Sequence, residues 1–119
     1  MSKGLVTLVG GSGFIGRYAA RVLVEQGWRV RVACRNVSTA IDARLAGPPG
    51  WVDVVQANIR NRDSLVRALD GADAVVNLVD ILFEHGRQTF EGEHAEGAAL
   101  VAEVAKEKGI TRFVQISAI

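Results

Sequence analysis

The sequence is poor in several features that mark particular classes of protein. Its 119 residues include one cysteine, Cys34, so no disulfide forms within the chain and a reducing compartment is expected. The formal net charge is only +1, which gives no reason to expect binding to nucleic acid or to an anionic membrane surface. No apolar run approaches the length of a membrane span, and no signal-peptide core follows the first residues. We therefore expect no membrane insertion and a cytoplasmic location.

The residues that are present are typical of a globular domain. Hydrophobic residues make up 49% of the chain and charged residues 23%. We expect a single domain over residues 1–119, without internal repeats, because this length suffices for one core. Strand-like and helix-like patterns alternate from end to end. Strands are expected at residues 5–9, 29–33, 52–56, 74–79 and 112–117, and helices at residues 14–26, 39–45, 63–69 and 89–108.

This alternation predicts an α/β fold. Strands that are separated by helical crossovers pair in parallel, through right-handed connections. The nearly continuous apolar runs at 5–9 and 74–79 fit a sheet that is covered on both faces. We therefore predict a three-layer Rossmann-type doubly wound parallel sheet of five strands in the order 3-2-1-4-5. The order reverses between strands 1 and 4, which places a ligand crevice beside residues 10–16.

A glycine motif joins the first strand to the first helix. Gly10 permits a sharp turn, Gly13 removes a side chain where a pyrophosphate approaches the backbone, and Gly16 permits close packing of helix and strand. The start of the helix then presents N–H groups to phosphates. The alternative is a tight strand-to-helix turn that binds nothing. The expected loop contacts are Gly10, Ser12, Gly13, Phe14, Ile15 and Gly16.

The end of the second strand indicates which dinucleotide fits. An acid there would bind the ribose 2′-hydroxyl, whereas an arginine accommodates a 2′-phosphate. Residues 32–36 contain no acid and include Arg35, which can bind a phosphate through two parallel hydrogen bonds. NADP(H) is therefore the expected cofactor, and NAD(H) stays open. In the alternative interpretation, Arg35 is a solvated loop charge.

Further residues are expected beside the same crevice. Asn58 would supply an amide group and Ile59 an apolar wall for adenine. Leu78 and Val79 end the fourth strand, where they either border the cofactor or pack in the core. Asp80 follows them, and its carboxylate would repel phosphates unless it points away or is protonated.

With these motifs in place, the chain resembles the atypical and extended short-chain dehydrogenase/reductase proteins. Among these, the closer match looks like the subgroup that contains the Rossmann-type accessory subunit of respiratory complex I and its bacterial relatives. Residues 7–17, 76–79, 81–84 and 112–118 carry the resemblance. The resemblance implies a phosphate loop at the three glycines, an NADP-type contact at Arg35, and adenine contacts at Asn58 and Ile59.

The chain also departs from that family. Ser117 matches the family's serine at the end of the fifth strand, but the Tyr-x-x-x-Lys pair that works with it in active members is absent, and the only tyrosine is Tyr18. Asp80 stands where relatives usually have glycine. We therefore expect an excised or redesigned N-terminal half that binds the dinucleotide without catalytic machinery of its own. The alternatives are a fragment of an NADP-dependent reductase or epimerase, with Ser117 as a weak catalytic candidate, and a non-binding dimerisation scaffold.

Two further expectations concern partners and metals. An Ala-rich helix over Thr89–Lys108 and an edge strand over Arg112–Ser117 each offer apolar surface for a homodimer. The alternative is a monomer with a helix that is merely Ala-rich. Glu91 and His94 have the spacing of half a metal site, but such pairs are more often solvated helix neighbours, so we expect no metal.

Overall fold

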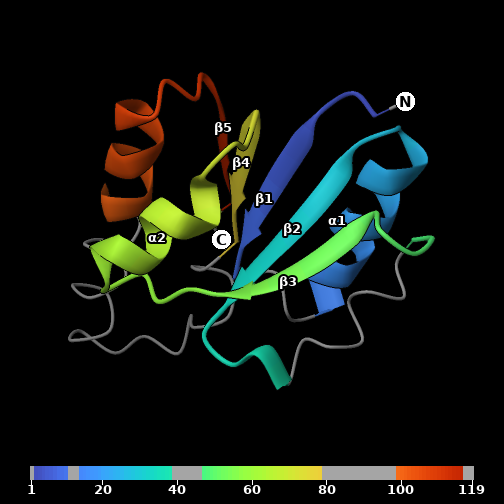
Figure 1. The fold of residues 1–119 in the computed structure, drawn as a ribbon, viewed down its shortest axis with the longest axis horizontal. Helices are drawn as coiled ribbons and strands as arrows, with labels where there is room; N and C mark the ends of the chain where they lie inside the picture. The colour runs from blue at the N-terminus through green and yellow to red at the C-terminus, as the bar shows by residue number, and fades with distance from the viewer. Residues whose placement is uncertain (1, 11–13, 39–46, 79–98, 117–119) are drawn as a thin grey trace.

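The computed structural model describes residues 2–10, 14–38, 47–78 and 99–116, which form a parallel sheet with helices on both faces (Figure 1). The elements are β1 (Leu5–Val9), α1 (Phe14–Glu25), β2 (Arg29–Cys34), β3 (Val52–Gln56), α2 (Arg62–Leu69), β4 (Ala74–Asn77) and β5 (Arg112–Gln115). Residues 99–107 form a further helical segment before β5. The strand order is β3-β2-β1-β4-β5, and every neighbouring pair is parallel. The predicted fold class and strand order are therefore confirmed.

The ends of several elements differ slightly from the sequence expectation. β2 continues to Cys34, whereas β4 stops at Asn77 and β5 stops at Gln115. Leu78 follows β4 and still donates its N–H to the carbonyl of Val9 at 2.8 Å. Apolar residues run past the last pair of the ladder here, so hydropathy alone places the strand end too late. The expected helix at 39–45 and residues 89–98 of the long helix lie outside the described residues.

Two apolar cores lie on opposite faces of the sheet. Successive residues of a strand point to opposite faces, so Val6 and Leu8 of β1 enter one core and Val9 enters the other. The first core also holds Ala20 of α1, whereas the second holds residues of α2 and of the segment 99–107. Figure 1 shows α1 on one side of the sheet and the other two helices on the opposite side. This is the three-layer arrangement that the sequence predicts.

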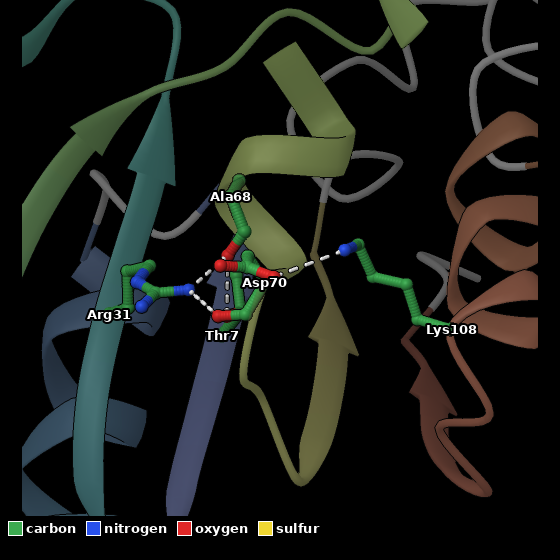
Figure 2. A network of polar contacts seen from close by, with 5 residues as sticks. All are labelled: Thr7, Arg31, Ala68, Asp70 and Lys108. Carbon is green, nitrogen blue, oxygen red and sulfur yellow. Dashed lines mark hydrogen bonds and ion pairs between the residues drawn. The ribbon is translucent and has the colours of Figure 1, made fainter. Parts of the chain in front are cut away.

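A polar network anchors the last turn of α2 to the sheet (Figure 2). Thr7 and Arg31 are register partners on β1 and β2. The Thr7 hydroxyl donates to the carbonyl of Ala68 at 2.9 Å, and the Arg31 guanidinium donates to the carbonyls of Ala68 at 2.8 Å and Asp70 at 2.7 Å. Lys108 lies 3.4 Å from the Asp70 carboxylate. The final carbonyls of a helix lack partners within it, so these side chains supply them.

We expect Thr7→Val to lower the free energy of unfolding by about 1 kcal/mol, because the fully buried carbonyl of Ala68 loses one of its two side-chain donors. Combining Thr7→Val with Arg31→Met removes both donors and should cost more than the sum of the single changes. Urea unfolding of the four proteins in this cycle measures the coupling. Thr111→Val, at an exposed position before β5, is the control and should change stability little. Strictly additive losses would contradict the shared role of this carbonyl.

Candidate functional site

The candidate site lies at the edge of the sheet where the parallel strands end. From β1 the chain passes through α1 to β2 on one side, while β4 lies on the other side of β1. β1 and β4 are therefore neighbours, and the strands that come next in the chain, β2 and β5, lie on opposite sides of this pair. This is the topological switch point, where open α/β sheets bind their ligands (Figure 1).

The turn after β1 shows why glycine is needed there. Gly10 has φ +79°, in the left-handed region that side chains rarely adopt, and its N–H donates to the carbonyl of Ala33 at 2.7 Å. Phe14 begins α1, Ile15 is exposed and Gly16 is buried. The first turn of α1 thus starts close to the end of β1, and its leading N–H groups have no partner within the helix. The predicted contacts Ser12 and Gly13 lie outside the described residues.

The segment after β2 presents a cation from a fixed turn. Arg35 is exposed, whereas Cys34 before it is buried. Asn36 accepts hydrogen bonds through its side-chain oxygen from the N–H of Ser38 at 3.0 Å and from the Ser38 hydroxyl at 2.6 Å. Burial raises the pKa of the Cys34 thiol, and a smaller contribution from the Asn36 backbone opposes this shift. The thiol is therefore neutral at physiological pH, and the charge at this point of the edge is that of Arg35.

The turn after β3 is held by side chains at both of its ends. The N–H of Asn58 donates to the Ser64 hydroxyl at 2.9 Å, and the N–H of Arg60 donates to the side-chain oxygen of Asn58 at 2.9 Å. Asn61 caps α2 by accepting from the N–H of Ser64 at 3.0 Å. The oxygen of Asn58 thus stabilises the turn. Ile59 packs against the core on the α2 face.

Sequence reasoning missed Ser64. Its side chain is buried on α2, six residues beyond Asn58, and its hydroxyl also donates toward the carbonyls of Asn58 at 3.1 Å and Asn61 at 2.8 Å. A serine in the first turn of a helix, following Asn61 as a capping residue, is the signal that was available.

The residues at the end of β4 serve the sheet itself. Asn77 is fully buried, and its Nδ2 donates to the side-chain oxygen of Gln115 on β5 at 2.9 Å. Leu78 is also buried, so it supports the edge by packing and through its backbone bond to β1. Val79, Asp80 and Ser117 lie outside the described residues.

Other kinds of site find no support in the part of the chain that the structure describes. There, no three His, Cys, Asp or Glu side chains come together as metal ligands. Glu91 and His94 fall outside that part. Of the helices described, none has the length and apolar character needed to cross a membrane.

Comparisons with known proteins agree with this geometry. The sequence model of the NmrA-like family matches residues 2–118. The NADH-ubiquinone oxidoreductase 40 kDa subunit of Neurospora crassa, a mitochondrial protein, is 29% identical over 111 residues, covering 93% of this chain and 30% of that protein. The ceramide reductase of Caulobacter vibrioides is 29% identical over 122 residues, covering 99% of this chain and 36% of that protein. The chain thus spans only about a third of the length of these relatives.

Solved structures show the same fold. A putative NAD-dependent epimerase/dehydratase from Bacillus halodurans superposes with a TM-score of 0.78 at 26% identity, over 98% of this chain and 52% of that one. The enzyme WbmG of Bordetella bronchiseptica, solved in complex with NAD, gives a TM-score of 0.75 at 19% identity, over 96% of this chain and 37% of that one.

Proposed function

Because the chain belongs to the NmrA-like family, we propose that the carboxyl edge of its sheet binds an NADP-type dinucleotide. The turn at Gly10 and the start of α1 would hold the pyrophosphate, since a glycine at positive φ permits the sharp turn and the first N–H groups of a helix lack partners within it. The turn after β3 would receive the adenine, through the Nδ2 group of Asn58 and the apolar side chain of Ile59. The residues present at this edge therefore fit the group.

The observation that carries the choice of NADP is the position of Arg35. It is exposed directly after β2, and the described residues 35–38 contain no acid that would bind a ribose 2′-hydroxyl instead. Paired calorimetric titrations with NADPH and NADH, at low and moderate salt, test the proposal. Tighter binding of NADPH than of NADH, with an affinity that falls as salt is added, supports the proposal. No heat with either nucleotide would contradict it and favour the alternative of a non-binding scaffold.

We further propose that these residues bind the cofactor without carrying out chemistry of their own. Bound NADPH would supply a hydride, but carbonyl reduction also needs a positioned proton donor. The only tyrosine, Tyr18, lies on α1 and has no lysine four residues later. The ceramide reductase among the relatives supports the alternative, that a longer protein containing this domain is a reductase. Oxidation of NADPH by the 119-residue chain with carbonyl substrates would contradict the proposal.

We also propose that the protein forms a homodimer. The exposed residues of β5 support this better than those of the helical segment 99–107. Val114 is 51% exposed and Ile116 is 37% exposed. Val114 pairs in register with Val76, which packs on the α1 face of the sheet. Val114 and Ile116 are two residues apart, so both lie on that face, and no helix covers them in the described structure. The exposed residues of the segment 99–107 include Glu103 and Glu107, which pair with Arg62 of α2.

We expect Val114→Lys to shift the protein from dimer toward monomer, because it places a charge in the proposed apolar contact. Sedimentation equilibrium measures the mass directly. Tyr18→Lys is the matched control, since it charges another exposed large apolar side chain, 65% exposed on α1, and should leave the mass unchanged. A wild-type protein that is monomeric at all concentrations, or an unchanged dimer in Val114→Lys, would disprove dimerisation through β5.

A further inference from the structure

The turn after β2 is fixed at its start by the neighbouring strand and by the core. The N–H of Ala57, directly after β3, donates to the carbonyl of Cys34 at 2.8 Å. The neutral Cys34 thiol donates to the carbonyl of Asn36 at 3.4 Å. Val37 is half-buried and packs against the core on the α1 face of the sheet. The backbone on both sides of Arg35 is therefore held in place.

The Asn36 side chain closes the other end of this turn. Its Oδ1 atom accepts hydrogen bonds from the N–H of Ser38 at 3.0 Å and from the Ser38 hydroxyl at 2.6 Å. An asparagine that bonds to the backbone two residues further on mimics a backbone turn and limits the conformations of the residues between them. Asn36 and Ser38 are both exposed. The two bonds to Oδ1 therefore stabilise the part of the turn that lies outside the core.

The Arg35 side chain is exposed and takes part in none of these bonds. An arginine has several rotatable bonds, so binding a phosphate through both arms of its guanidinium costs conformational entropy. A fixed backbone lowers this cost, because the starting point and direction of the side chain are set before the ligand arrives. If the turn had several conformations, the affinity for the phosphate would fall with the fraction of molecules in the competent one.

We propose that Asn36 is a positioning residue that fixes the backbone from which Arg35 binds the 2′-phosphate of the dinucleotide. This inference rests on the proposed function, because it concerns the same phosphate and the same arginine. Asn36 acts through Arg35, so it contributes only when the ligand carries the 2′-phosphate and only while Arg35 is present. The choice of NADP over NAD thus depends on an uncharged side chain as well as on the guanidinium.

Calorimetric titrations with NADPH and NADH test this role. Asn36→Ala should weaken NADPH binding about fivefold and change NADH binding less than about twofold, because only NADPH needs the positioned guanidinium. Asn36→Ser keeps a side-chain oxygen that can accept a bond from the backbone two residues further on, more weakly than asparagine. Its NADPH affinity should therefore lie between those of Asn36→Ala and the wild type. Circular dichroism checks that each variant is folded.

Asn61→Ala is the matched control for Asn36→Ala. Asn61 is also exposed, and its side-chain oxygen also accepts from a backbone N–H at 3.0 Å, that of Ser64. The two variants thus lose the same side chain and the same kind of bond in the turns after two neighbouring strands. Asn61→Ala should leave the ratio of the NADPH and NADH affinities unchanged.

A double-mutant cycle with Arg35→Ala separates positioning from a structural role. In the Arg35→Ala background, Asn36→Ala should change NADPH binding less than about twofold, because no guanidinium remains to be positioned. The same loss in both backgrounds would overturn the inference, since Asn36 would then act independently of Arg35. Equal losses of NADPH and NADH binding in Asn36→Ala would also overturn it, because Asn36 would then support the whole site.

The outcomes also distinguish this inference from the proposed function. If the wild-type protein binds neither nucleotide, the proposed function fails and the role of Asn36 fails with it. If the wild type prefers NADPH, Arg35→Ala removes that preference and Asn36→Ala keeps it in full, the proposed function stands and only the role of Asn36 is wrong.

Discussion

Replacing Arg35 with alanine should weaken NADPH binding about 30-fold while NADH binding changes little. Hydrogen bonds between a guanidinium and a phosphate contribute about 1.5–3 kcal/mol, and each 1.4 kcal/mol is a factor of ten in affinity. Arg35 is exposed, so the loss should be largest at low ionic strength and shrink as salt screens the pair. Titrations with both nucleotides at two salt concentrations measure the change.

Arg29→Ala provides the control for Arg35. Arg29 is also exposed and begins β2, the strand that Arg35 follows, so it lies at the opposite edge of the sheet. The two variants lose the same charge and the same side chain, so a difference between them reports position alone. Equal losses in both would show that Arg35 acts only through the net charge of the protein. Equal loss of NADPH and NADH binding in Arg35→Ala would place Arg35 away from the 2′-phosphate.

Truncating Leu65 to alanine should lower the free energy of unfolding by about 3 kcal/mol. Leu65 is completely buried on α2, in the core that also contains Val9, Val75 and Val101. The shorter side chain leaves a cavity that the surrounding residues fill only in part. For a domain of this size the melting temperature should fall by roughly 10–15 °C. Urea and thermal unfolding measure the two quantities.

Val66→Ala separates this effect from a change in helix propensity. Val66 is the next residue of α2, and it is only partly buried against the same core. Alanine favours the helix slightly at both positions, so the difference between the variants reports the cavity. Similar stabilities for the two variants would mean that α2 is not packed as tightly as its burial indicates. Leu65→Ala should also loosen the turn at Asn58, because Ser64 tethers that turn to the same helical turn.

Local sequence patterns predicted the fold because the signals for each strand, turn and helix lie within a few residues of one another. The apolar run of β1, the turn at Gly10 and the helix from Phe14 are contiguous, and the right-handed crossover rule then orders the strands. The support of α2 by Thr7 and Arg31 was not predictable in this way. Its acceptor, the carbonyl of Ala68, lies 61 and 37 residues further along the chain, so it becomes visible only when the register of β1 and β2 is known.

The candidate site was predictable in outline and less so in detail. Sequence reasoning placed Gly10 and Arg35 at the edge where the structure has them, because both follow directly from a strand end. It assigned Asn58 to adenine but did not predict that the side-chain oxygen of Asn58 accepts a hydrogen bond from the N–H of Arg60. A residue that stabilises a turn and a residue that binds a ligand look alike in sequence. The roles of Ser12, Gly13, Val79 and Ser117 remain predictions, because they lie outside the described residues.

The backbone hydrogen bonds that continue past the strand ends have an evolutionary consequence. The N–H groups of Gly10, Ala57 and Leu78 each bond to a carbonyl at the end of the neighbouring strand. The segments after β1, β3 and β4 therefore each start from a fixed anchor, and changes further along them need not disturb the sheet. Loops of new sequence and length can be exchanged here while the framework persists, so one scaffold can acquire different ligand preferences in different descendants.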